Sequence, residues 1–140
     1  MDTLYTAEAL STGAGRDGRV VTSDGTLDLT LAPPKELGGS GDGTNPEQLF
    51  AAGYAACFHS ALQGVARQRK IVIQDSSVGG RVRIGTNGEG GFQLAVELEV
   101  VLPGIAPDQA QELADAAHQV CPYSNATRGN IDVTVQVSDD

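Results

Sequence analysis

One segment near the middle of this 140-residue chain constrains the fold more than any other feature. From Leu49 to Leu62 the sequence LFAAGYAACFHSAL contains no Asp, Glu, Lys or Arg, and a helix built from it is apolar on almost every side. A helix that is apolar all round is buried rather than laid on a surface. The many alanines in it would let other backbones come close. The sequence therefore predicts a buried central helix.

The start of this helix carries several signals. Either Asn45 or Thr44 can cap its N-terminus, and Pro46 suits the first helical position, where a missing N–H costs nothing. Thr44 and Glu47 have the spacing of a capping box. We expect the helix to run from here to about Lys70.

The segments before the central helix indicate strands and loops. Residues 4–10 can form an opening strand, and residues 19–31 place Ser-Asp-Gly-Thr between two β-rich arms, which is a strong hairpin signal. Residues 11–19 are glycine-rich and residues 32–46 are rich in Pro and Gly, so both are expected to be loops.

The segments after the central helix complete an α+β pattern. Residues 80–104 predict two strands around a glycine-rich turn, residues 106–121 predict a second, amphipathic helix, and residues 131–137 alternate like a strand. We therefore expect antiparallel sheets with two main helices, the central one buried. The length suits one domain with one core, and we expect residues 1–140 to form a single domain.

The charge balance excludes several classes of partner. The formal net charge is -9, so a nucleic-acid partner is disfavoured, and no basic run suggests a membrane surface. The N-terminal residues lack the pattern of a signal peptide, and no stretch is long and apolar enough to span a bilayer. We therefore expect a cytoplasmic protein. In that compartment a persistent disulfide is usually catalytic or redox-sensing.

The chain has only two cysteines, Cys57 in the central helix and Cys121 at the end of the second helix. One such cysteine alone would best be interpreted as an inert, buried thiol. Two cysteines on inward-facing positions favour a redox pair. They lie 64 positions apart (121 minus 57), so the sequence leaves open whether they meet in space.

A zinc site is the other interpretation of these residues. Cys57-x-His59 and His118-x-x-Cys121 would supply two sulfurs and two imidazoles. Positions i and i+2 of a helix lie on different faces, so Cys57 and His59 would not converge on one ion. We therefore predict no metal, and we expect both histidines to lie at the surface or its rim.

A reactive cysteine needs positive charge near its thiolate. The central helix carries no cation before Arg67, so the charge must come from elsewhere. Arg16 and Arg19, in the expected loop of residues 11–19, are candidates. Solvated loop arginines are the alternative interpretation for either one alone.

The motifs TNPEQLFAAGYAACFHSAL and VCPYSNATRGNIDV, preceded by GRDGR, closely resemble the organic hydroperoxide resistance family, within the wider group of the osmotically inducible protein C. The resemblance covers essentially the whole chain. It implies an intertwined α+β homodimer and a thiol peroxidase that reduces alkyl or lipid hydroperoxides to alcohols. It also implies no bound cofactor and a lipoylated protein as electron donor, whose dihydrolipoyl group is the reductant.

The resemblance also implies roles for four residues. Cys57 matches the peroxidatic cysteine and Cys121 the resolving cysteine, so the expected intermediates are a Cys57 sulfenic acid and a Cys57–Cys121 disulfide. Arg16 and Glu47 match the family's arginine and acid. We expect Arg16 to stabilise the thiolate while Glu47 holds Arg16 in a bidentate pair.

Three apolar residues, Phe50, Phe58 and Leu62, are candidates for the walls of a substrate site. Such walls would suit an alkyl or lipid hydroperoxide better than hydrogen peroxide. Each of the three could equally be an ordinary core residue.

Helix geometry constrains how this site is assembled. Glu47 and Cys57 are ten residues apart, which on a straight helix is about 15 Å of rise and roughly 80° short of three full turns. One Arg16 side chain cannot easily touch both. We therefore expect the Arg16–Glu47 pair to come from the partner subunit, with the site at the dimer interface.

Two other classes of function stay open. A redox sensor would use the same cysteine chemistry to signal to a partner rather than turn over, although no DNA-binding motif or basic face supports it. A structural or binding domain with inert thiols would be indifferent to peroxide. Serine hydrolase chemistry is disfavoured, because GYAAC is not a nucleophile elbow.

Overall fold

The computed structural model of the chain describes residues 1–139 and confirms an α+β fold. The chain divides into two compact units, the first spanning Met1–Leu49 and the second beginning at Phe50. Each unit contains one three-stranded sheet. No helix within the described residues is long and apolar enough to cross a membrane. That the whole chain is a single domain stays a prediction.

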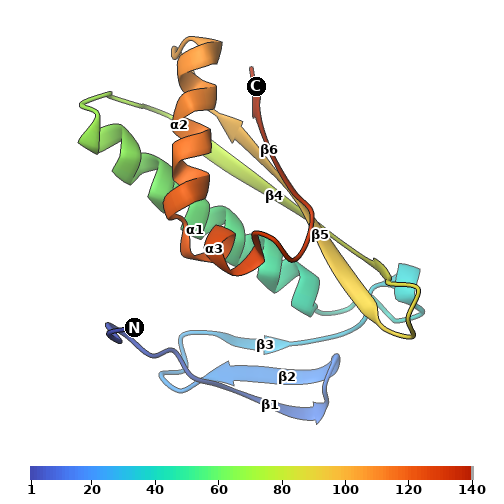
Figure 1. The fold of residues 1–140 in the computed structure, drawn as a ribbon. Coiled ribbons are helices and arrows are strands. Elements are labelled where there is room, and N and C mark those ends of the chain that lie inside the picture. The colour runs from blue at the N-terminus through green and yellow to red at the C-terminus, as the bar shows by residue number, and fades with distance from the viewer. Residues whose placement is uncertain (140) are drawn as a thin grey trace. The chain divides into compact units, whose positions relative to one another are not determined.

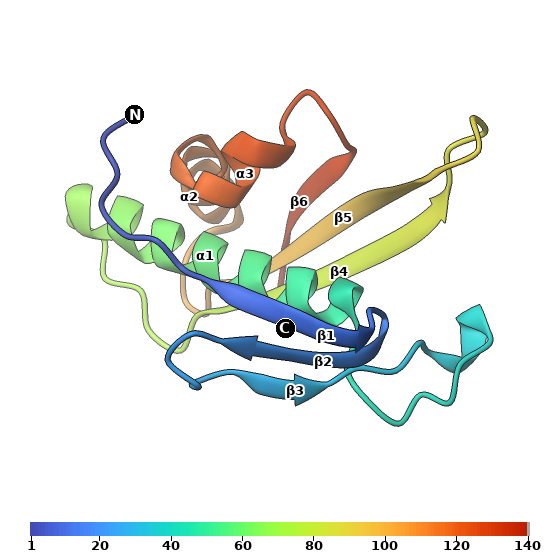
Figure 2. The same ribbon diagram turned by 90° about the horizontal axis from the view of Figure 1, so that it is seen from below.

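The first unit contains the antiparallel strands β1 (Ala9–Ala14), β2 (Asp17–Thr22) and β3 (Asp28–Thr30), which lie side by side in that order (Figure 2). The predicted hairpin around Ser-Asp-Gly-Thr is confirmed, since it joins β2 to β3. The Asp24 carboxylate stabilises this turn by accepting hydrogen bonds from the Thr26 N–H and the Thr22 hydroxyl.

Two predictions for the N-terminal segment were wrong. The opening strand begins only at Ala9, and the glycine-rich segment expected to be a loop forms most of the β1–β2 hairpin. One of its glycines, Gly15, forms part of the turn. Ala14 pairs with Asp17, which leaves a two-residue connection in which Gly15 has a φ of +69°, a conformation that suits glycine. Arg16 therefore lies at the tip of a hairpin.

Helix α1 (Pro46–Gln68) matches the predicted central helix within two residues at its C-terminal end. Asn45 is the N-cap, because its side-chain oxygen accepts the backbone N–H of Gln48 at 2.8 Å. The predicted capping box does not form, since the Glu47 carboxylate binds Arg16 instead. A short 3₁₀ helix, η1 (Lys35–Leu37), lies within the predicted loop before α1.

The second unit has a sheet of β4 (Ser77–Thr86), β5 (Phe92–Val101) and β6 (Val133–Ser138), in that order. β4 and β5 are antiparallel, as predicted, but β6 runs parallel to β5, so this sheet is mixed. The reason is the connection: the chain leaves the end of β5, crosses back through helices on one face and enters β6 from the end at which β5 begins (Figure 1).

Helix α2 (Pro107–Val120) matches the predicted second helix, whereas helix α3 (Pro122–Thr127) was missed. Pro122 was interpreted only as a stop signal for α2. It is also the first residue of α3, a position that proline favours. Cys121 is thus a one-residue corner, the C-cap of α2 and the N-cap of α3.

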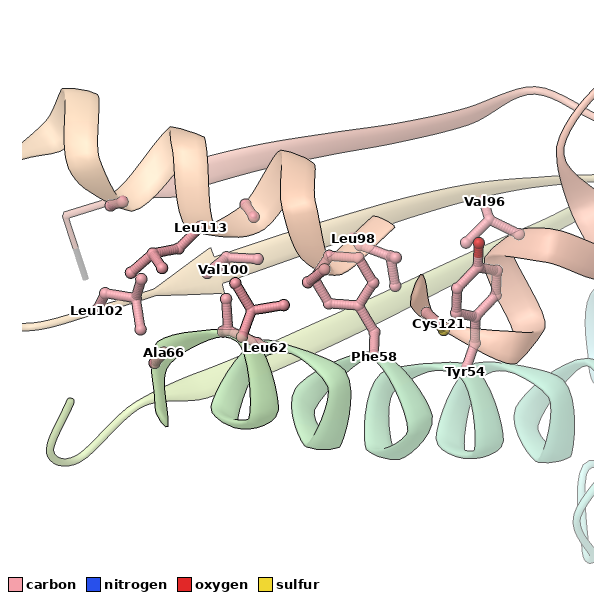
Figure 3. Close-up of a cluster of buried hydrophobic side chains, with 14 residues drawn as sticks. Tyr54, Phe58, Leu62, Ala66, Val96, Leu98, Val100, Leu102, Leu113 and Cys121 are labelled. Carbon is pink, nitrogen blue, oxygen red and sulfur yellow. The ribbon is translucent and has the colours of Figure 1, made fainter. Parts of the chain in front are cut away.

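The core of the second unit lies between the sheet and its helices. Strand register aligns apolar residues into rows, such as Val78 beside Val100 and Leu98 beside Val135. Helix α1 contributes Tyr54, Phe58 and Leu62, which are fully buried against these rows and α2 (Figure 3). The buried face of α1 agrees with the predicted central helix.

The opposite side of α1 is less covered within this chain. Three small residues there are exposed: Ala52, Ala56 and Ser60.

Glycine at position 80 of β4 lets helix α1 approach the sheet closely, since a Cβ on Gly80 would lie 2.8 Å from the carbonyl oxygen of Ala51. The strand and the helix backbone are therefore in direct contact at this point.

A Gly80→Ala substitution should lower the free energy of unfolding by roughly 1–3 kcal/mol, because the added methyl group overpacks the contact with α1. The matched control is Gly79→Ala on the other face of β4, where an added Cβ has no neighbour within 4 Å. Urea unfolding of both variants measures the difference. Equal midpoints for the two variants would contradict this account of the helix–sheet contact.

Candidate functional site

The two cysteines meet in the second unit. Cys57 lies half-buried in the middle of α1, and Cys121 lies fully buried at the α2–α3 corner. Their sulfur atoms are 3.7 Å apart, with the Cys121 thiol donating toward Cys57. A disulfide has an S–S length of roughly 2.05 Å, so these are two free thiols in contact. The packing of the helices therefore brings Cys57 and Cys121 into contact, which the sequence alone had left open.

The environment of Cys57 has opposing effects on its thiol. Burial raises the pKa of Cys57 above its ordinary value, while the backbone N–H of Tyr123 lowers that pKa and the adjacent Cys121 raises it. The net direction is upward. Within the second unit, then, the thiol form of Cys57 is favoured, and added positive charge would be needed to favour the thiolate.

A groove of about 710 Å³ lies beside Cys57 in the second unit. It runs along one face of α1 toward its C-terminal end and is bounded across from α1 by Val120 and Pro122. Its α1 residues are mostly small or apolar: Ser60, Ala61, Gly64, Val65, Arg67 and Gln68. An apolar group that approached Cys57 could pack against this surface.

The three predicted wall residues do not line this groove. Phe58 and Leu62 have no exposed surface and belong to the core. Phe50 is half-buried and packs edge-on against the rings of Tyr54 and Tyr123, with centroids 6.1 Å away from each. A role for them in substrate binding stays a prediction.

Arg16 and Glu47 form a bidentate ion pair in the first unit. The two terminal nitrogens of the Arg16 guanidinium donate to the two Glu47 oxygens at 2.9 and 2.7 Å. Arg16 lowers the pKa of the Glu47 carboxyl, so the pair is charged at neutral pH. Glu47 is also in the first turn of α1, where a carboxylate is favoured by the helix dipole.

Arg19, the other candidate cation, has a different partner. It lies in β2 and donates two hydrogen bonds to the Asp28 carboxylate of β3, at 2.8 and 2.6 Å. This pair bridges neighbouring strands of the first sheet. Arg16 at the hairpin tip and Arg19 in the strand therefore have separate roles in the first unit.

A buried polar network next to Cys121 was missed from the sequence. The Tyr54 hydroxyl of α1 is 2.9 Å from the Ser124 hydroxyl and 3.0 Å from the Thr127 hydroxyl, both in α3. His118 of α2 lies 2.7 Å from the same Ser124 hydroxyl. No local sequence pattern predicts this network, because its four residues come from three helices.

His118 lies at the rim, as expected, since it is only partly buried, but its ring also bonds to the buried Ser124 hydroxyl, which was not foreseen. Burial lowers the pKa of His118, the charge of Arg128 lowers it further, and the carboxylate of Asp115 acts in the opposite direction. His59, by contrast, bonds to the Ser76 hydroxyl at 2.9 Å, away from this network. Across residues 1–139, no group of three or more His, Cys, Asp or Glu side chains could hold a metal ion.

Comparisons with known proteins agree on one family. Residues 39–136 match the OsmC family, described as OsmC-like protein. The chain is 57% identical over 137 residues to an organic hydroperoxide resistance protein of Xanthomonas axonopodis pv. citri, covering 96% of this chain and 95% of that one.

Two solved structures are similar in fold as well as in sequence. An organic hydroperoxide resistance protein from Elizabethkingia anophelis superposes with a TM-score of 0.95 at 51% identity, covering all of both chains. OhrB of Bacillus subtilis gives a TM-score of 0.88 at 45% identity, covering 97% of this chain and 100% of that one.

Stability should depend on pH through His118. Because its folded-state pKa lies below the ordinary value of 6.5, the unfolded chain takes up the proton first as the pH falls. The contribution of His118 is therefore present above that ordinary pKa and is lost as the pH drops through the lower, folded-state pKa. Unfolding free energies measured from about pH 8 to about pH 5 should fall, and the fall should be smaller in His118→Asn. An unchanged slope in the variant would contradict the assignment.

Proposed function

This chain belongs to the OsmC-like protein family, among the organic hydroperoxide resistance proteins, and on that premise we propose that it is a cysteine-based peroxidase that reduces organic hydroperoxides to alcohols. The names of its relatives support a peroxide-detoxifying role. The observation that carries the proposal is the contact between two free thiols, Cys57 and Cys121, at 3.7 Å. Two thiols that served only to fill the core would not have to lie in contact with each other.

In the first proposed step the Cys57 thiolate attacks the outer oxygen of a hydroperoxide, R–O–O–H. An S–O bond forms and the O–O bond breaks, which leaves a sulfenic acid on Cys57 and an alkoxide that takes up a proton to become the alcohol. Cys57 is accessible for this step, because it is half-buried and lies beside a groove whose α1 residues are mostly small or apolar.

In the second proposed step the Cys121 sulfur attacks the sulfenic sulfur. The S–S bond forms, the S–O bond breaks, and hydroxide leaves with the Cys121 proton as water. A dithiol then reduces the disulfide by exchange and becomes a disulfide itself. We propose the dihydrolipoyl group of a lipoylated protein as this dithiol, and a cytoplasmic location, where thiols are kept reduced.

We further propose that the active form is a homodimer, in which the Arg16–Glu47 pair of one subunit serves the cysteines of the other. The environment of Cys57 in the second unit raises its pKa, so a cation is needed to favour the thiolate. Arg16 is a suitable cation, because Glu47 fixes its guanidinium through two hydrogen bonds. Ten helical residues separate Glu47 from Cys57, about 15 Å of rise, which favours a cation from a second subunit.

Peroxide consumption by the purified protein tests the activity. We expect turnover with tert-butyl hydroperoxide and dihydrolipoamide, and much slower turnover with hydrogen peroxide or with glutathione. Cys57→Ser should lower the rate by at least about 10³-fold, because it removes the nucleophile. Cys121→Ser should allow one oxidation and then lose activity as Cys57 oxidises further. Oxidation that stops after one equivalent in the wild type would instead favour a redox sensor.

Mixed dimers test the shared site. Arg16→Ala should lower the rate by about 10²-fold, through loss of charge stabilisation. Mixing Cys57→Ser subunits with Arg16→Ala subunits should restore part of the activity, because one of the two sites in each mixed dimer then has both residues. Arg19→Ala, which alters a strand–strand ion pair in the same sheet, is the control and should not need complementation. Two inactive parents whose mixture stays inactive would rule out the shared site.

A further inference from the structure

The polar network beside Cys121 has a single consistent direction of hydrogen bonding. The Thr127 hydroxyl donates to the backbone carbonyl of Ser124 at 3.2 Å, which uses its one proton. Tyr54 must then donate to Thr127, Ser124 must donate to Tyr54, and His118 Nδ1 must donate to Ser124. The result is a chain of four hydrogen bonds that begins on α2, passes through α3 to α1 and returns to α3.

Burial strengthens the part of this chain formed by the three hydroxyl groups, whereas His118 at its start is only partly buried. Tyr54 and Ser124 have no exposed surface, and Thr127 is 5% exposed. Hydrogen bonds in such an environment are not exchanged for bonds to water, and an unpaired hydroxyl there is costly. No buried side-chain nitrogen or oxygen within residues 1–139 lacks a partner, so the network is complete.

Three members of the network lie close in sequence to the two cysteines. Tyr54 is three residues before Cys57 on α1, whereas His118 and Ser124 are three residues before and after Cys121. Figure 3 shows Tyr54 on the same stretch of α1 that Cys121 faces. The thiol contact and the Tyr54–Ser124 bond are therefore two parallel links between the same elements, α1 and the α2–α3 corner.

The α2–α3 corner needs such a link. Helix α3 has only six residues, too few to be stable without tertiary contacts. A corner of one residue, Cys121, would let α3 pivot and carry the sulfur with it. Tyr54 holds Ser124 and Thr127 on one side, and Arg128 ties α3 back to the carbonyl of His118 at 2.9 Å on the other.

We propose that the hydrogen-bond chain from His118 through Ser124 and Tyr54 to Thr127 positions the Cys121 sulfur for attack on oxidised Cys57, and so selects disulfide formation over further oxidation. This inference rests on the proposed peroxidase function. The four residues are positioning residues, since they act through Cys121.

Further oxidation of Cys57 is the reaction that competes with disulfide formation, and the positioning of Cys121 matters because of it. A second hydroperoxide can oxidise the Cys57 sulfenic acid to a sulfinic acid and leave as an alcohol, which ends the cycle. Disulfide formation prevents this only when it is faster. Closing the sulfur–sulfur distance from 3.7 Å to a bond of about 2.05 Å requires a small, directed movement of the corner, and a loosely held corner would make that movement slower.

The test measures how Cys57 partitions between the two products. Fully reduced, full-length protein is mixed with tert-butyl hydroperoxide, the reaction is stopped by alkylation, and mass spectrometry counts the disulfide and the sulfinic acid. In Tyr54→Phe and in Thr127→Val the ratio of sulfinic acid to disulfide should rise about five- to tenfold, the effect of one hydrogen bond on a rate. The rate of the first oxidation should stay the same.

Two matched variants separate positioning from general loss of stability. Thr127→Ser keeps the hydroxyl and should restore the wild-type ratio. Ser76→Ala removes a serine–histidine hydrogen bond of 2.9 Å at His59, away from the network, and should leave the ratio unchanged.

Three outcomes would overturn the inference. The first is a wild-type ratio in both Tyr54→Phe and Thr127→Val. The second is a ratio that rises in every variant, Ser76→Ala included, in step with the loss of unfolding free energy. The third is a wild-type protein whose Cys57 is not oxidised at all, which would remove the proposed peroxidase function as well.

Discussion

The site depends on the packing of the α2–α3 corner against the middle of α1. Cys57 and Cys121 are 64 positions apart, and only this packing brings their sulfurs to 3.7 Å. The contact is possible because α1 presents a stripe of Tyr54, Phe58 and Leu62 that is buried against the sheet and α2 together. Burial of such large apolar side chains is the dominant stabilising term in folding. The cysteine pair is thus held by the core itself.

The same packing places polar groups inside the core. The hydroxyls of Tyr54, Ser124 and Thr127 would each be unfavourable there alone. Together with His118 they satisfy one another, and the geometry that satisfies them is specific to one arrangement of α1, α2 and α3. An apolar contact tolerates small shifts, whereas a closed chain of hydrogen bonds does not. A network of this kind suits a place where a sulfur must be held within a bond's reach of another.

Much of this protein could be predicted from local patterns. The central helix, the Ser-Asp-Gly-Thr hairpin, the β4–β5 pair and α2 follow from periodicity, capping and turn residues, which act between neighbours in the chain. The errors have local causes as well. The glycines of residues 11–19 were interpreted as a loop, although a hairpin also needs glycine at its turn. Pro122 was interpreted as the end of one helix, although it also begins another.

The sequence by itself determined most of the elements, the two cysteines, and the family motifs around them, including the Arg16–Glu47 partnership that the first unit contains as a bidentate pair. The tertiary structure decided the rest: the parallel pairing of β6, the contact of the two thiols, and the buried chain through Tyr54. The physical reason is distance along the chain. Periodicity and turn chemistry report interactions between residues a few positions apart, whereas these contacts join residues far apart, and they form only when helices and sheet pack around a common core.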